Sequence, residues 1–134
     1  MNTSLAHLEI RIDPANNGFY RDLLGFLGWG VLYEGNGMLG LGASNQASLW
    51  FVGGANASKH DYDGVGVNHV AIGAESVADV DSAAAYLKEK AVVALFETPR
   101  HRPEFASSEK DTYYQVMFES PDRLLFEVVY TGPK

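Results

Sequence analysis

The chain has 134 residues, of which 46% are apolar, a formal net charge of −7, and no cysteine. This length and apolar content suit one domain with a core of its own. The negative charge argues against nucleic acid as a partner, because phosphate binding needs a clustered basic surface. Without cysteine there is no disulfide or thiolate metal site, so a bound metal would need nitrogen and oxygen ligands.

The sequence shows no segment that would direct the chain into a membrane. Its apolar runs stay below the roughly 18 residues of a membrane-spanning helix. Residues 1–6 lack the basic and apolar regions of a signal peptide. Together with the absence of thiols, this pattern favours a cytoplasmic protein that binds neither membranes nor nucleic acid.

The first half of the chain reads as a strand, a helix and three further strands. Residues 6–12 alternate between apolar and polar side chains, and Asp13-Pro14 ends this strand. Asp13 or Asn16 can cap the helix expected over residues 16–27. The expected apolar stripe of that helix is Phe19, Leu23, Phe26 and Leu27. Three more strands, separated by glycine-rich turns, are predicted at residues 30–34, 38–42 and 47–52.

After a loop expected over residues 54–64, the same order of elements starts again. A strand is predicted over residues 67–73 and an alanine-rich helix over residues 77–90. The expected apolar stripe of this helix is Val80, Ala84 and Leu87. Strands are predicted near residues 92–97, 112–119 and 124–130, with a polar loop at 99–111. The repetition predicts an α+β fold of two βαβββ modules, residues 1–53 and 65–134, in a single domain.

Three polar residues occupy similar places in these predicted strands. His7 begins His-Leu-Glu-Ile, His69 lies in Asn-His-Val-Ala-Ile, and Glu127 lies in Leu-Phe-Glu-Val-Val. A carboxylate buried among apolar residues costs several kcal/mol unless a charge or a metal compensates it. Two imidazoles and one carboxylate on a shared sheet face would form a facial metal triad with open coordination positions. The alternative for each histidine is an ordinary packed or solvent-facing side chain.

Motifs at both ends and in the middle of the chain form a recognisable combination. They are His7-Leu8-Glu9-Ile10 with Phe19-Tyr20-Arg21-Asp22-Leu23-Leu24-Gly25, Asn68-His69-Val70-Ala71-Ile72, and Ser120-Pro121-Asp122 with Leu125-Phe126-Glu127-Val128. This combination resembles the vicinal-oxygen-chelate superfamily, which includes glyoxalase I, extradiol dioxygenases, fosfomycin-resistance transferases and bleomycin-binding proteins. The likeness covers nearly the whole chain, but it selects no single activity, because sites rather than folds decide function.

The resemblance implies a cupped mixed sheet and one divalent metal held by His7, His69 and Glu127. Iron, manganese, nickel, cobalt and zinc all accept this ligand set. It also implies a homodimer with sites shared between subunits, in which His7 comes from one subunit and His69 with Glu127 from the other. The sequence leaves open whether His7 is instead supplied by the same chain. Beside Glu127, Glu9 is a candidate catalytic residue, as a substitute ligand or a general base. Its alternative is an exposed carboxylate that pairs with Arg11.

Departures from the family pattern separate the named activities. Glyoxalase I enzymes use a fourth ligand, generally a glutamate, at the place of Trp50, which cannot coordinate a metal. Fosfomycin-resistance enzymes carry a threonine near the place of Glu9 and a basic residue for phosphonate, and that activity is disfavoured here. An extradiol dioxygenase needs a further base beside its iron(II). The two remaining histidines, His60 and His101, are expected to be exposed loop residues.

A small substrate chelated through two oxygens is the expected partner of the metal. Candidate substrate-binding residues are Trp50, Arg100, Arg102, Tyr113, Gln115 and Met117. Strand alternation directs Tyr113, Gln115 and Met117 to one face, and Tyr114, Val116 and Phe118 to the face beneath the helix. The sequence therefore predicts a metal-dependent enzyme with lyase or isomerase chemistry. Extradiol ring cleavage with iron(II) and bleomycin-like small-molecule binding remain the alternatives.

Overall fold

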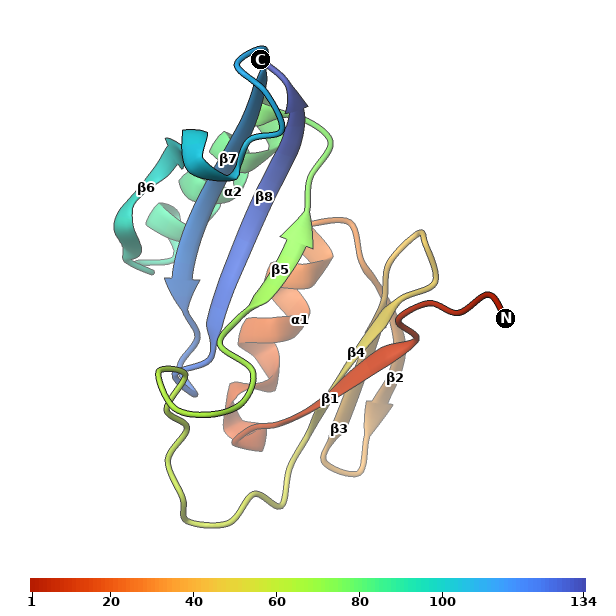
Figure 1. The fold of residues 1–134 in the computed structure, drawn as a ribbon. Helices are drawn as coiled ribbons and strands as arrows, with labels where there is room; N and C mark the ends of the chain where they lie inside the picture. Colours follow the sequence, from red (N-terminus) through yellow and green to blue (C-terminus); the bar gives the residue numbers. More distant parts are fainter. The chain divides into compact units, whose positions relative to one another are not determined.

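The computed structural model describes all residues, 1–134, and divides into two compact units, Met1–Lys59 and His60–Lys134. Each unit contains one four-stranded mixed sheet, one α-helix and one short 3₁₀ helix (Figure 1). Within each unit the order is strand, helix and three strands, which is the predicted α+β fold of two βαβββ modules. The boundary between the units falls within the predicted loop 54–64.

Unit 1 is built on a sheet with the strand order β1-β4-β3-β2. Its elements are β1 (His7–Arg11), the 3₁₀ helix η1 (Pro14–Asn16), α1 (Asn17–Phe26), β2 (Gly30–Gly35), β3 (Met38–Gly42) and β4 (Ser48–Val52). Strand β1 runs parallel to β4, while the other pairs are antiparallel. The alternation predicted for β1 is confirmed, since His7, Glu9 and Arg11 are exposed and the residues between them are half-buried.

Helix α1 packs on this sheet through a face that the sequence analysis placed slightly wrongly. Tyr20, Leu23 and Leu24 are buried, and the Tyr20 ring stacks on Phe51 of β4 with centroids 4.2 Å apart. Phe26, expected in the stripe, is 50% exposed. The buried residues follow the helical spacing i, i+3, i+4, starting from Tyr20. The sequence analysis had assigned Phe19 to this face instead of Tyr20.

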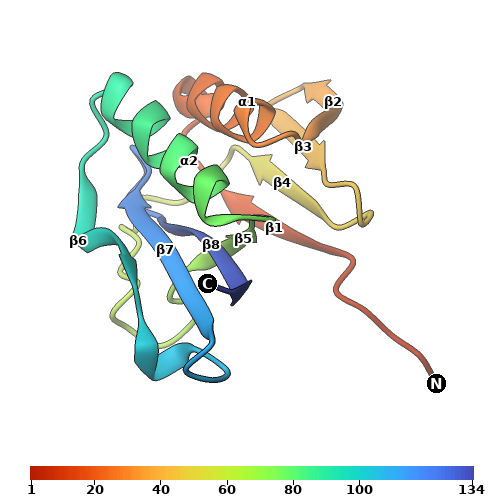
Figure 2. The ribbon, with the colours of Figure 1, turned by 90° about the horizontal axis from the view of Figure 1, so that it is seen from above.

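Unit 2 is built on a sheet with the strand order β5-β8-β7-β6. Its elements are β5 (Val70–Gly73), α2 (Val77–Glu89), β6 (Ala94–His101), the 3₁₀ helix η2 (Pro103–Phe105), β7 (Asp111–Glu119) and β8 (Leu125–Pro133). Helix α2 contacts β6, β7 and β8 and lies along one face of this sheet (Figure 2). The core below it combines apolar residues of the helix and strands: Val80, Ala83, Leu87, Val116, Phe118, Phe126 and Val128.

Strand β6 is longer than predicted because it continues through an irregularity. Its pairing with β7 shifts between Leu95 and Arg100, where Phe96 and Glu97 adopt left-handed backbone angles, φ +58° and +60°. The Thr98 hydroxyl accepts a hydrogen bond from the Met117 backbone N–H at 2.9 Å, in place of a ladder bond. Such a bulge interrupts the alternation by which a strand is recognised in sequence.

The predicted loop 99–111 is therefore wrong at its beginning, where residues 99–101 belong to β6. His101 was expected to be an exposed loop residue, but it is a half-buried strand residue. Its Nδ1 lies 2.6 Å from the Thr112 hydroxyl of β7, so the ring is held by hydrogen bonding within the sheet.

Tyr114 ties β7 to helix α2, as the predicted strand parity requires. Its hydroxyl donates to Asp81 at 2.6 Å, and this bond together with burial raises the pKa of Tyr114 to about 12. The ordinary tyrosine pKa is about 10. The Tyr114–Asp81 bond therefore contributes fully to the free energy of unfolding below pH 10, and this contribution is lost as the pH rises toward 12.

We expect Tyr114→Phe to lower the free energy of unfolding at neutral pH by about 1 kcal/mol or less, because the bond is solvent-accessible. Urea unfolding of both proteins at about pH 7 and about pH 11 measures this difference, and it should shrink at the higher pH. An equal difference at both pH values would contradict the assignment.

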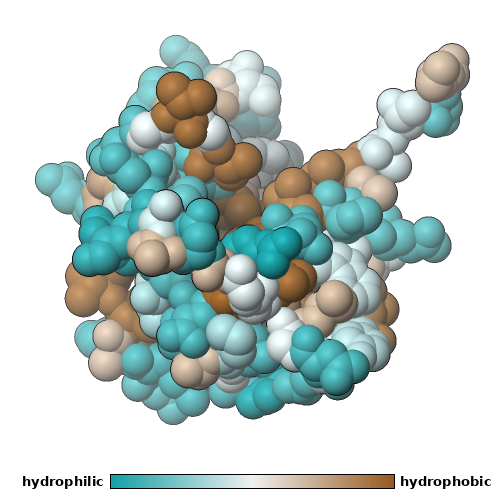
Figure 3. All heavy atoms as spheres, turned by 90° about the horizontal axis from the view of Figure 1, so that it is seen from below, coloured by the Kyte–Doolittle hydropathy of each residue, from teal (hydrophilic) through white to brown (hydrophobic).

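Large apolar side chains are exposed in both units, among them the consecutive residues Val31, Leu32 and Tyr33 of β2 and Phe96 and Phe105 of unit 2. Figure 3 shows apolar residues on one face with polar residues between them. Exposed apolar side chains are common on protein surfaces. Neither α-helix combines the length and the apolarity needed to cross a bilayer.

Candidate functional site

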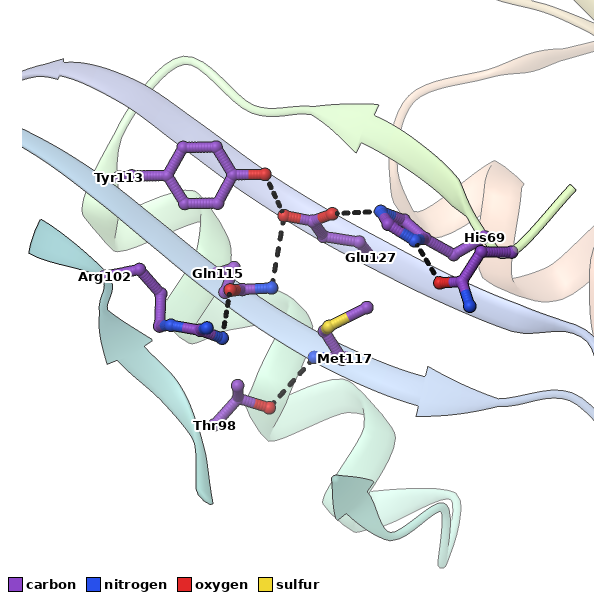
Figure 4. A network of polar contacts seen from close by, with 8 residues as sticks. His69, Thr98, Arg102, Tyr113, Gln115, Met117 and Glu127 are labelled. Carbon is purple, nitrogen blue, oxygen red and sulfur yellow. Dashed lines mark hydrogen bonds and ion pairs between the residues drawn. The ribbon is translucent and has the colours of Figure 1, made fainter. Parts of the chain in front are cut away.

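Glu127 is the only charged side chain of the chain that is buried, with 1% of its surface exposed. It lies in β8 between Phe126 and Val128, which point to the opposite, helix-covered face. A buried carboxylate of this kind is stable only if hydrogen bonds and a positive charge compensate its lost hydration. Figure 4 shows the polar side chains that surround it.

His69 reaches Glu127 because of the parallel pairing of β5 and β8. Ala71 stands opposite Glu127 in this pairing, and His69 lies immediately before β5 with its side chain directed at Glu127. The strand predicted over residues 67–73 therefore begins later than expected, at Val70. The imidazole Nε2 lies 2.9 Å from Glu127 Oε2, and the histidine side chain is 35% exposed. The two residues meet as the sequence suggested, while their role as metal ligands stays a prediction.

The hydrogen on Nδ1 of the His69 ring follows from the contact with its neighbour Asn68. The Asn68 amide nitrogen donates to the backbone carbonyl of Tyr62 at 2.8 Å, so its oxygen is the atom that faces His69 Nδ1 at 2.7 Å. Because an amide oxygen only accepts, Nδ1 carries a hydrogen. A neutral ring would then turn the Nε2 lone pair toward the Glu127 carboxylate.

The second oxygen of Glu127 is held by two donors from β7. The Tyr113 hydroxyl donates to Oε1 at 2.6 Å, and the Gln115 amide nitrogen donates to it at 3.2 Å. Burial, together with the bond to Glu127, raises the pKa of Tyr113 to about 12, so the phenol remains a donor at neutral pH. Oxygen Oε1 is thus occupied, and Oε2 is left directed at His69.

Gln115 is in turn contacted by Arg102, which follows β6. The Arg102 Nη1 donates to the Gln115 amide oxygen at 3.2 Å, and its Nε donates to Glu104 at 2.6 Å. The guanidinium carbon lies 5.0 Å from the centre of the Phe105 ring, which meets Tyr113 edge-on at 5.4 Å. These contacts join the segment 102–105 to the Glu127 site.

The remaining candidates of unit 2 lie on the same sheet face. Met117 pairs with Glu127 across β7 and β8, and its side chain lies beside the carboxylate in Figure 4. Arg100 pairs with Gln115 across β6 and β7 and is exposed. The face therefore carries the predicted substrate-binding residues Arg100, Arg102, Tyr113, Gln115 and Met117. Their contact with a substrate stays a prediction.

In unit 1 the candidates share the exposed face of β1 and β4. His7 pairs with Ser48, and Glu9 pairs with Trp50. The Glu9 carboxylate lies 3.8 Å from Arg11, with both side chains more than half exposed, so the ion pair that we weighed against a catalytic role is present. The Trp50 indole nitrogen donates to the Ser48 hydroxyl at 3.0 Å.

Gly40 of β3 leaves the space in which the Trp50 ring lies. A methyl group at Gly40 would stand 2.5 Å from the nearest ring carbon, which is closer than van der Waals contact allows. We therefore expect Gly40→Ala to displace the indole and to lower the free energy of unfolding by about 1–3 kcal/mol.

Trp50 fluorescence, isolated in a Trp29→Phe background, and urea unfolding measure the effect of this change. Gly25→Ala in helix α1 is the matched control, because a methyl group there meets nothing within 4 Å. The control should be neutral or stabilising by up to about 1 kcal/mol. An unchanged emission spectrum and unfolding energy in Gly40→Ala would be incompatible with the packing described.

No group of three His, Asp or Glu side chains placed to hold one metal ion is found in the structure. His69 and Glu127 belong to unit 2 and His7 to unit 1. Sequence analysis missed three contributors to the site: Asn68, Glu104 and Phe105. Asn68 was visible as the polar neighbour of a candidate ligand, but the other two carry no signal apart from their closeness to Arg102.

Comparisons with known proteins show which solved structures share this fold. No protein-family model and no curated protein matches the sequence. A solved structure of a candidate glyoxalase from Bacillus halodurans is 27% identical, with 94% of both chains covered and a TM-score of 0.77. The chain has the vicinal-oxygen-chelate fold. Both the predicted superfamily resemblance and the predicted fold class are thereby confirmed.

More distant structures share this vicinal-oxygen-chelate fold. A glyoxalase/dioxygenase from Nostoc punctiforme is 15% identical, with 96% of this chain and 91% of that chain covered, at a TM-score of 0.70. A lactoylglutathione lyase from Agrobacterium tumefaciens is 18% identical, with coverages of 96% and 94% and a TM-score of 0.67. These names differ in chemistry, so the fold leaves the activity to be argued from the site.

Proposed function

We propose that the protein is a metal-dependent enzyme of the vicinal-oxygen-chelate type, with lyase or isomerase chemistry on a small substrate chelated through two oxygens. The observation that carries the proposal is the orientation of His69. Asn68 fixes a hydrogen on Nδ1, so that Nε2 faces the buried Glu127 carboxylate at 2.9 Å. A metal-bound histidine typically donates its other N–H to a carbonyl or carboxylate oxygen in this way.

The donors present fit a divalent metal of the expected kind. One imidazole nitrogen and one carboxylate oxygen suit iron, manganese, nickel, cobalt or zinc. We propose His7 as the third ligand on the basis of its position in the sequence, supplied by the same chain or by a partner subunit. A bound metal would supply a Lewis acid that stabilises an oxyanion of the substrate.

The chain's own residues would bind and orient the substrate around this centre. Arg100 is an exposed cation on the same sheet face, and it suits an anionic substrate group. The Tyr113 phenol, protonated at neutral pH, can donate a hydrogen bond but cannot serve as a base. Glu9 is the proposed proton acceptor on the basis of its position in the sequence, since it is exposed on the same face of β1 as the proposed ligand His7. Loss of activity in Glu9→Gln with unchanged metal content would support that role.

Metal titration tests the proposal directly. The purified protein should bind about one divalent transition metal per site, and His69→Ala should lose it. His60→Ala is the control, since His60 is an exposed histidine of the same unit. A wild-type protein that takes up none of these metals would refute the enzyme proposal and favour the bleomycin-like binding alternative.

Activity assays then separate the two chemistries. Hemithioacetals with nickel or zinc probe lyase and isomerase activity, whereas catechols with iron(II), with and without oxygen, probe ring cleavage. Turnover of hemithioacetals without oxygen uptake is the expected result. Oxygen-dependent consumption of a catechol would contradict the lyase or isomerase proposal and favour the dioxygenase alternative.

We further propose a cytoplasmic homodimer with shared sites. Light scattering gives the oligomeric state, and mixed dimers test the sharing. If His7 and Glu127 of one site come from different subunits, combining His7→Ala with Glu127→Gln protein restores one intact site per dimer. A monomer, or mixed dimers that bind no metal, would exclude the shared arrangement.

A further inference from the structure

We infer that Arg102 and Gln115 form a relay that fixes the orientation of the Glu127 carboxylate, so that both are positioning residues of the site. The inference rests on the proposed function only in taking Glu127 to be a metal ligand. The relay runs from the surface segment after β6, through the buried side chain of Gln115, to one carboxylate oxygen (Figure 4).

The orientation of the Gln115 amide is determined by what it contacts. A guanidinium only donates hydrogen bonds, so the amide oxygen must face Arg102, 3.2 Å from Nη1. The amide nitrogen is thereby turned to the opposite side, where it donates to Glu127 Oε1 at 3.2 Å. Gln115 is 2% exposed, so water cannot replace either partner without rearrangement of the sheet face.

Arg102 is itself held in place, which makes it suitable as the outer end of the relay. Its Nε donates to Glu104 and its guanidinium lies over the Phe105 ring, so its planar group is fixed by contacts on more than one side. Its side chain is 20% exposed. A lysine at this position has a single ammonium group and cannot reproduce both the bond to Glu104 and the bond to Gln115.

The consequence for Glu127 is a carboxylate with two unlike oxygens. Oxygen Oε1 accepts bonds from both Tyr113 and Gln115, while Oε2 faces His69 Nε2. Loss of the Gln115 donor would leave Tyr113 as the only donor to Oε1 and would loosen the orientation of the carboxylate about its terminal bond. Metal affinity depends on such outer hydrogen bonds, and their loss typically costs 10- to 100-fold.

The relay differs in its measurable effects from a purely structural role of the same residues. If Gln115 only stabilised the sheet, its replacement would lower stability without changing metal affinity in the folded protein. If Arg102 acted on Glu127 other than through Gln115, its replacement would add to the effect of replacing Gln115. A double-mutant cycle separates these possibilities.

The experiment measures the cobalt(II) affinity of wild type, Gln115→Met, Arg102→Met and the double variant by competition with a chelator. We expect roughly 10-fold or greater weakening in Gln115→Met, with a changed cobalt absorption spectrum. Arg102→Met should weaken binding by a smaller factor, and the double variant should match Gln115→Met alone. Tyr114→Phe, on the opposite face of β7, is the control and should bind as wild type.

A second measurement needs no metal and keeps the relay testable by itself. The side-chain amide resonances of Gln115 in the metal-free protein should shift in Arg102→Met and in Glu127→Gln, and should remain in place in Tyr114→Phe. Wild-type protein without metal affinity would refute the proposed function, and the relay would still be judged by these resonances. Unmoved resonances in Arg102→Met, or full metal affinity in a folded Gln115→Met, would overturn the relay.

Discussion

The Glu127→Gln variant is expected to keep its fold and to lose stoichiometric binding of divalent metals. Tyr113 and Gln115 both donate to the position of Oε1, so the carbonyl oxygen of a glutamine at 127 would occupy it. Its amide nitrogen would then take the position of Oε2 and donate to His69 Nε2. The buried groups remain satisfied, but the ring nitrogen is occupied and the anionic ligand is gone.

The affinity loss in Glu127→Gln should be on the order of 100-fold or more, since changes in outer hydrogen bonds alone reach 10- to 100-fold. Isothermal titration with zinc or nickel measures it, and circular dichroism shows whether the fold is retained. Glu119→Gln is the matched control, because Glu119 is a half-buried carboxylate of β7 that accepts a bond from Tyr62. Metal binding by Glu127→Gln at wild-type affinity would remove Glu127 from the ligand set.

The parts of the fold that could be predicted are those in which side-chain alternation follows the backbone without interruption. Strand β1 shows this, as does β7, where Tyr113 and Gln115 face Glu127 while Tyr114 reaches helix α2. A single polar residue within an apolar run, Glu127, was enough to indicate a buried carboxylate. Because burial of a charge is costly, a carboxylate within an apolar run predicts hydrogen-bond donors or a cation beside it in the folded protein.

The parts that could not be predicted depend on backbone conformations that the residue types do not indicate. Phe96 and Glu97 take left-handed angles that glycine or asparagine would normally occupy, so the course of β6 was misjudged. The error extended to His101, which became a loop residue in the prediction and is a strand residue in the structure. Local patterns give no warning when tertiary pairing overrides them in this way.

The prediction of details of the site was limited by a second physical cause, the direction of hydrogen bonds. Gln115 was predicted to face the site, but its bond to Glu127 depends on which end of its amide Arg102 occupies. The tautomer of His69 likewise depends on Asn68 and on the Tyr62 carbonyl. Such orientations arise from three or more groups brought together by the fold, and no spacing in the sequence encodes them.

The largest loss of stability is expected from Phe126→Ala, on the face of β8 opposite Glu127. Phe126 is 1% exposed, stands opposite Phe118 in the β7–β8 ladder, and stacks on its ring with centroids 5.8 Å apart. Removal of a buried phenylalanine ring leaves a cavity that the rigid sheet and helix α2 cannot close. The free energy of unfolding should fall by about 3–5 kcal/mol.

Urea unfolding followed by circular dichroism measures this loss, with Val93→Ala as the control at an apolar side chain of the same unit that is 75% exposed. The control should change stability by no more than about 0.5 kcal/mol. Because Phe126 and Glu127 point to opposite faces, the Gln115 amide resonances should stay in place in Phe126→Ala under conditions where it remains folded. A small stability loss would contradict the close packing of Phe126. A disturbed Glu127 network in the folded variant would show that the two faces of β8 are not independent, and that the helix-covered core also sets the geometry of the site.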